Sequence, residues 1–223
     1  MKPTASGNVL DVQSGQEITF QELHDKLVAD INVRQPREDS CTGYLIQTCL
    51  FPQSSLNPLK GKALNTLRIA TLRDIEGGIH LDFAMIRIAD PEAVSDNLHR
   101  GGMVAGVDVN TGGISSVTYG YENETGPWLE KKPIDLGSYF KKRKVPKWKL
   151  MTETAMRFHS VTPGLNSIGW DVSLTKRGPV VIEGNDNWDM IIAQVVEGGY
   201  LTSERRGILS GYNIKLPSKK QSL

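Results

Sequence analysis

The segment from residue 169 to residue 185, "GWDVSLTKRGPVVIEGN", carries three oxygen-bearing side chains, Asp171, Glu183 and Asn185. Two carboxylates that lie close together repel each other unless a cation sits between them. Magnesium binds one or two carboxylates, keeps some of its waters and takes its other ligands from phosphates. The pattern therefore favours a metal–nucleotide site. The alternative is a half-exposed hairpin whose acids simply face solvent.

The three donors can meet only if their segment folds back on itself. Alternation predicts strands over residues 167–175 and 179–185, joined by the turn "KRG". That turn places Asp171 opposite Glu183. Side chains two positions apart in a strand, such as Glu183 and Asn185, leave the same face of the sheet.

A second group could bind phosphate. The stretch "NLHRGG" holds Asn97 and Arg100 beside a pair of glycines, which let a backbone approach a ligand closely. Arginine grips phosphate through a planar fork. Arg68 and Arg87 each interrupt an apolar strand, where a charged side chain either faces water or answers a buried anion. For each of these arginines the alternative is a solvated side chain.

Local pairing of the remaining elements predicts the fold class. We expect an α+β protein with a mainly antiparallel sheet. The segment 52–62 reads as a linker, which divides the chain into domains 1–60 and 61–223. The predicted helices cover residues 18–27, 149–161 and 188–199, and the other predicted strands cover residues 43–51, 63–72, 79–89, 103–109 and 114–120.

Composition narrows the function classes. The net charge of +1 provides no general attraction to nucleic acid, and the only support for such a role is "KKRK" (141–144) near Trp148. No apolar run approaches the ~20 residues that span a membrane. Two cysteines cannot form a disulfide framework. We expect a cytoplasmic protein without a membrane span.

The order of these motifs resembles that of the ATP-grasp ligases. "NLHRGG" followed by "GWD…GPVVIEGN" is similar to the ribosomal-protein glutamate ligases, whereas "LNTLRIATL", "VPKW" and "IGWDVSLTKRGPVVIEGN" resemble more closely the sugar-transfer-associated ATP-grasp family. The resemblance runs from about residue 45 to residue 188. It implies an ATP-grasp-like α+β fold with helices flanking the sheet, in which ATP lies between two lobes.

The resemblance assigns roles to single positions. Asp171, Glu183 and Asn185 match the magnesium ligands. The residues that match catalytic positions near the phosphates are Arg68, Asn97 and Arg100.

Positions in the first 60 residues match the nucleotide-binding part of the small lobe. Lys2 resembles the lysine that contacts the α- and β-phosphates, although the loop after it offers only Gly7 where the family has several glycines. The strand that resembles the adenine-binding hinge holds Tyr44, Leu45, Ile46 and Gln47.

The implied reaction is ATP-dependent ligation of a carboxylate to an amine through an acyl phosphate, on a sugar or polysaccharide precursor. Its cofactors would be ATP and Mg²⁺, with Mn²⁺ as a substitute, and its substrates small-molecule carboxylates and amines. Two alternatives stay open because the small lobe resembles a remnant truncated at its N-terminus. One is a catalytically weak nucleotide-binding or regulatory module. The other is a homo-oligomer, or a subunit whose partner chain supplies the missing lobe.

Overall fold

The computed structural model describes two parts of the chain separately. They are two compact units, Met1–Phe51 and Pro52–Leu223, whose border lies before the boundary expected after residue 60. The residues that the structure describes are 2–3, 9–10, 16–34, 43–44, 50, 56, 61, 63–91, 93, 96, 102–119, 139–140 and 142–217.

The first unit contains a small antiparallel sheet followed by one helix. The sheet has the order β1-β2-β3, with strands at Lys2–Pro3, Val9–Leu10 and Glu17–Ile18. Helix α1 follows directly and spans Phe20–Arg34. The predicted strand at residues 43–51 lies almost wholly outside the described residues.

Helix α1 begins two residues after the start predicted at residue 18. The Thr19 Oγ1 atom accepts a hydrogen bond from the Glu22 backbone N–H at 3.1 Å. In return, the Glu22 carboxylate accepts one from the Thr19 N–H at 2.7 Å. This reciprocal capping box satisfies two backbone donors at the helix start. The helix continues to Arg34, well beyond the predicted end at residue 27.

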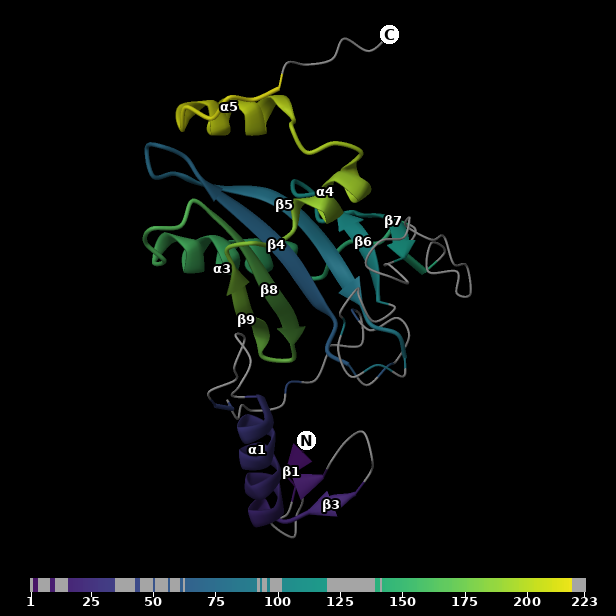
Figure 1. Ribbon diagram of the computed structural model, residues 1–223. Coiled ribbons are helices and arrows are strands. Elements are labelled where there is room, and N and C mark those ends of the chain that lie inside the picture. Colours follow the sequence, from purple (N-terminus) through teal and green to yellow (C-terminus); the bar gives the residue numbers. More distant parts are fainter. Residues whose placement is uncertain are drawn as a thin grey trace. The chain divides into compact units, whose positions relative to one another are not determined.

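The second unit is built on a six-stranded antiparallel sheet of order β7-β6-β5-β4-β8-β9 (Figure 1). This arrangement confirms the predicted α+β class with a mainly antiparallel sheet. The strands span Thr66–Arg73 (β4), Ile79–Ile88 (β5), Met103–Val107 (β6), Ile114–Tyr119 (β7), Ser167–Thr175 (β8) and Gly178–Asn185 (β9).

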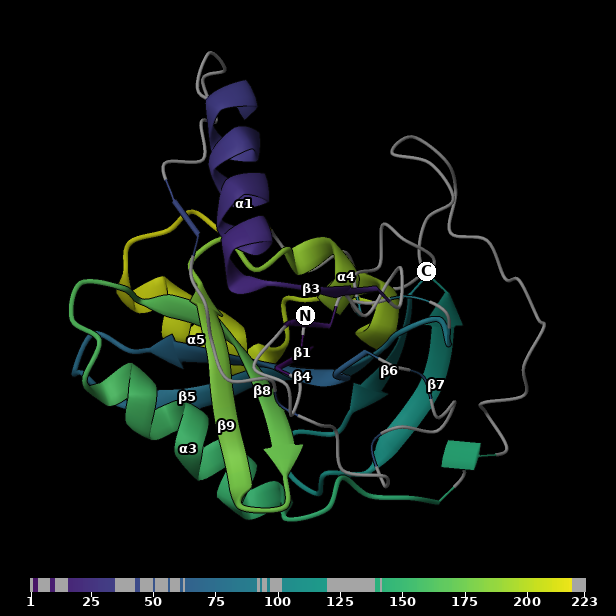
Figure 2. The ribbon, with the colours of Figure 1, turned by 90° about the horizontal axis from the view of Figure 1, so that it is seen from below.

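Alternate side chains of the central strands point to opposite faces of this sheet, and helices cover both faces. One face packs against α3 (Trp148–Ser160), and its core includes Ile69 and Trp170. The other packs against α4 (Met190–Glu197), and its core includes Phe83. Figure 2 shows α3 and α4 on opposite sides of the sheet, and the last helix is α5 (Ser203–Gly211).

Candidate functional site

The hairpin of β8 and β9 brings the predicted donors together. Asp171 pairs directly with Glu183, and Gly169 pairs with Asn185, so the predicted register is confirmed. The turn is tighter than expected, because Thr175 already pairs with Gly178. A bulge between the pairs Val172–Val181 and Asp171–Glu183 restores the register.

That bulge decides which side chain faces the site. In a regular strand Val181 and Glu183 would leave the same face. Here Val181 packs against the core on the α3 side, whereas Glu183 lies opposite Asp171. The extra residue is Ile182, whose side chain is half exposed. An irregularity of one residue therefore puts an acid, and not Ile182, beside Asp171.

Two arginines hold the Asp171 carboxylate. Arg68 Nε donates to Asp171 Oδ1 at 2.6 Å, and Arg68 Nη2 donates to Oδ2 at 3.3 Å. Arg87 Nη2 donates to Oδ2 at 2.6 Å. The side chains of Asp171 and Arg68 are only 2% and 9% exposed. Charge-assisted hydrogen bonds of this kind are the strongest that side chains make.

The path of Arg68 depends on a glycine. A Cβ atom at Gly169 would lie 2.9 Å from Arg68 Cδ and 2.3 Å from Trp188 Cβ, so the aliphatic part of Arg68 and Trp188 occupy the space that a side chain would need. The Arg68 Nη1 group also donates to the Trp188 carbonyl oxygen at 3.1 Å. The glycine of "GWD" therefore lets a neighbouring strand's arginine reach Asp171.

Arg87 is held in the same way by a second acid. Its Nη2 lies 3.5 Å from Asp96 Oδ1, and its Nε donates to Thr66 Oγ1 at 3.1 Å. Asp96 Oδ2 in turn accepts hydrogen bonds from the Thr66 backbone N–H at 2.9 Å and hydroxyl at 2.6 Å. Arg87 Nη1 has no hydrogen-bond partner among the described residues, and its side chain is 17% exposed.

Glu183 and Asn185 offer the oxygens of the site that no guanidinium occupies. Asn185 Nδ2 donates to Gly169 O and to Glu183 Oε1, both at 3.3 Å. That geometry orients the amide and leaves Asn185 Oδ1 and Glu183 Oε2 without partners in the described part of the chain. Carboxylate and amide oxygens are the donors that Mg²⁺ prefers, so these two residues fit the ion. Asp171 fits it less well, because guanidiniums occupy both of its oxygens.

The other predicted site residues lie either outside the described residues or in the first unit. Asn97, Arg100, Leu45, Ile46 and Gln47 lie outside the described residues. Lys2 lies in β1. The Tyr44 hydroxyl donates to Asp30, also in the first unit. Their roles stay predictions. Within the described residues no group of three or more His, Cys, Asp or Glu side chains could hold a metal.

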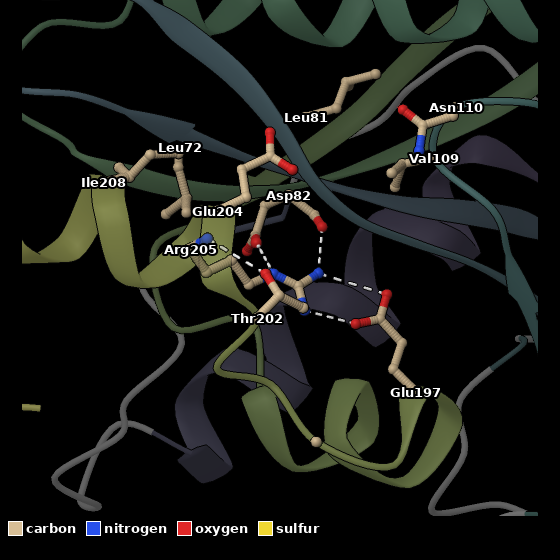
Figure 3. Close-up of a pocket in the computed structure, with 11 residues that line it drawn as sticks. Leu72, Leu81, Asp82, Val109, Asn110, Glu197, Thr202, Glu204, Arg205 and Ile208 are labelled. Atoms are coloured by element: carbon tan, nitrogen blue, oxygen red, sulfur yellow. Dashed lines mark hydrogen bonds and ion pairs between the residues drawn. The ribbon is translucent and has the colours of Figure 1, made fainter. Parts of the chain in front are cut away.

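A separate cavity of about 390 Å³ lies where α5 meets the sheet (Figure 3). Arg205 fills its centre: its Nε donates to Asp82 Oδ1 and its Nη1 to Glu197 Oε2, each at 2.5 Å. The Tyr200 hydroxyl also donates to Asp82, at 2.7 Å. Burial raises the pKa of Asp82, against the opposing effects of Tyr200 and Arg205. Arg205 pairs with both Asp82 and Glu197, so this cluster joins α4 and α5 to β5.

Sequence reasoning missed part of the site. Asp96 precedes the "NLHRGG" stretch directly, but only the fold brings it beside Arg87, which lies on β5. Trp188 contributes through its backbone carbonyl, a group that no side-chain pattern can reveal. The position of Arg87 inside an apolar strand was the one available indication that it answers a buried anion.

A family model described as sugar-transfer associated ATP-grasp matches residues 11–208 of the chain. The chain matches no curated protein and no solved structure. Within the described residues, none of the helices has both the length and the apolar character needed to cross a membrane.

Proposed function

Since the chain belongs to the sugar-transfer-associated ATP-grasp family, and ATP-grasp proteins are in general ATP-dependent ligases, we propose that it joins a carboxylate to an amine through an acyl phosphate. The observation that carries this proposal is the cluster of Arg68, Arg87 and Asp171 on the same face of the sheet as Glu183 and Asn185. It sets two guanidiniums beside exposed oxygen donors, which is the combination that a metal–phosphate group requires.

Each member of the cluster has a role in this proposal. Magnesium, when bound, neutralises charge on the phosphoryl group that is transferred. Glu183 and Asn185 would hold it through their unpartnered oxygens. Arg87 would present its unpartnered Nη1 to a phosphoryl oxygen, and the guanidinium of Arg68 would add positive charge to the site. Such fixed donors stabilise charge that develops in a transition state without having to reorganise.

The nucleotide contacts in the first unit remain part of the proposal by resemblance alone. Lys2 would contact the α- and β-phosphates, and the backbone of residues 44–47 would hold adenine. In the second unit Asn97 and Arg100 would bind at the phosphate end. The family description favours a sugar or polysaccharide precursor as the substrate that is modified.

Turnover tests this function. We expect the purified chain to release ADP from ATP and Mg²⁺ when it is offered a carboxylate and an amine, screened among amino acids, uronic acids and amino sugars. Glu183→Gln removes the charge of the proposed metal ligand and is expected to lower turnover at least 100-fold. Glu153→Gln makes the same chemical change on the exposed side of α3, where the Glu153 carboxylate lies 3.7 Å from Lys149 Nζ, and should leave turnover unchanged. Equal turnover in both variants would contradict the assignment of Glu183.

A second candidate is a nucleotide-binding module without ligase activity. It is favoured by the single glycine, Gly7, in the loop that resembles the phosphate-binding loop of the small lobe. Calorimetry with ATP and Mg²⁺ separates the two. Tight binding without product from any carboxylate–amine pair supports the module, and formation of an amide rejects it.

A further inference from the structure

We infer that Asp171 is a positioning residue, which aligns Arg68 and Arg87 side by side for an anion, and that it is not itself a ligand of the metal. This inference rests on the proposed function. It departs from the family resemblance, by which Asp171 matches one of three magnesium ligands.

The hydrogen bonds of Asp171 carry the first step. Its two oxygens accept from Arg68 at 2.6 and 3.3 Å and from Arg87 at 2.6 Å. These three hydrogen bonds leave one lone-pair site on Oδ1, so a metal bound directly would either lie against the positive Arg68 guanidinium or displace one of the two arginines. Removing one partner from a buried ion pair is strongly unfavourable, because it leaves the other charge buried without compensation.

Burial supplies the second step. Asp171 lies on β8, which is covered on both edges by its neighbours β4 and β9, and its side chain is 2% exposed. Magnesium gives up its waters reluctantly and usually keeps several of them. On the edge strand β9, Glu183 is exposed and Asn185 is half-buried, so a hydrated ion can reach both. It cannot reach the Asp171 carboxylate, which two arginine side chains cover.

The way in which the arginines are held supplies the third step. Asp96 lies beside the same Nη2 of Arg87 that donates to Asp171, Thr66 accepts a hydrogen bond from Arg87 Nε, and the Trp188 carbonyl accepts one from Arg68. The two guanidiniums are thus held by several groups at once, and among the described residues Asp171 is the one that forms hydrogen bonds with both. Arg87 still has a free Nη1 among the described residues. This arrangement suits residues that must present donors in a fixed geometry.

ATP binding in the presence and absence of metal tests the inference on the full chain. Titrations would be followed by calorimetry, once with excess chelator and once with Mg²⁺. Asp171→Asn removes a negative charge near the phosphates, so Coulomb's law alone would strengthen binding of metal-free ATP. If Asp171 positions the arginines, the variant instead weakens ATP binding by about tenfold or more in both buffers, because the guanidiniums lose a charged partner.

Two further variants make the result specific. Glu183→Gln is expected to weaken ATP binding only in the Mg²⁺ buffer. Asp186→Asn makes the same chemical change as Asp171→Asn at an exposed position next to the site, and should change neither affinity more than about twofold. The inference is overturned if Asp171→Asn keeps or improves metal-free binding and loses only the Mg²⁺-dependent part.

A second route covers the case in which Asp171→Asn does not fold. Arg87→Met changes the partner instead of Asp171 and removes one of the two guanidiniums that bind its carboxylate. It should weaken metal-free ATP binding about tenfold and leave the ratio of the affinities with and without Mg²⁺ unchanged. If Asp171 were a metal ligand, releasing it from Arg87 would raise that ratio. If the unchanged chain binds no ATP in either buffer, the proposed function fails first and this inference falls with it.

Discussion

At the scale of single residues, Gly169 decides whether Arg68 can reach its acid. We predict that Gly169→Ala destabilises the protein by about 1–3 kcal/mol, since the new methyl group overlaps Trp188 and Arg68 in a packed region. ATP affinity should fall with it, because Arg68 is displaced. Urea denaturation and calorimetry measure the two effects.

The matched control is Gly199→Ala. A Cβ at Gly199 meets no atom within 4 Å, so this variant should have the stability and the ATP affinity of the original protein. If Gly169→Ala behaved like the control, the described path of Arg68 over the glycine would be wrong.

The donors of the site were predictable at this scale, but their arrangement was predictable only in part. Alternation and spacing place Glu183 and Asn185 on one face, and the hairpin places them near Asp171. The bulge at Ile182 is invisible in the sequence, because either register keeps an apolar residue on the core side. The guanidinium partners of Asp171 come from strands about 84 and 103 positions away, which no local pattern connects.

At the scale of elements, Arg205 connects α5 to the rest of the second unit. We predict that Arg205→Met lowers the free energy of unfolding by about 3–5 kcal/mol at neutral pH, because it leaves the buried Asp82 carboxylate without its cation. Urea denaturation followed by circular dichroism measures the change. The effect should exceed that of a surface pair several-fold, since the Arg205 and Asp82 side chains are 7% and 0% exposed.

Arg206 provides the control on the same helix. Its described hydrogen bond goes from Nη1 to the Pro217 carbonyl at the surface, at 2.7 Å. Arg206→Met should therefore cost less than about 1 kcal/mol. Equal losses in the two variants would show that the helix, and not the buried ion pair, determines the result.

Element boundaries followed the sequence where capping and stop signals are local. Thr19 and Glu22 form the capping box that starts α1, and Gly198 ends α4 in the left-handed conformation, close to the end predicted at residue 199. Helix α5 was not predicted. It has a good N-cap in Thr202, but Gly207 lowers the helix propensity in its middle. What anchors the helix is Arg205, whose partners lie on other elements.

At the scale of the whole molecule, the sequence indicated a division between two domains, and the structure divides into two units. The signal was the Pro- and Ser-rich stretch from residue 52, which begins at the observed border. The large difference between the hydrophobic cores of the two units was not predictable from composition. The described core of the first unit is limited to Ile18, Leu23 and Leu27, whereas the second unit holds two large clusters, one on each face of its sheet.

This asymmetry predicts how the units behave when separated. We expect a fragment of residues 52–223 to fold alone, with a cooperative thermal transition and a dispersed amide NMR spectrum, because its sheet and both covering clusters lie within it. A fragment of residues 1–51 should stay largely unfolded, since a chain of that length with so few buried apolar side chains among its described residues cannot offset its conformational entropy.

The same fragment tests the assignment of the nucleotide contacts to the first unit. If Lys2 and residues 44–47 hold the α- and β-phosphates and adenine, residues 52–223 keep their fold but bind ATP and Mg²⁺ at least about tenfold more weakly than the full chain, because only the terminal-phosphate contacts remain. Calorimetry on both proteins at equal Mg²⁺ compares them. Equal affinity would place the whole nucleotide site in the second unit and remove the roles proposed for Lys2 and Tyr44, whereas a fragment that does not fold would show that its two clusters are insufficient without the first unit.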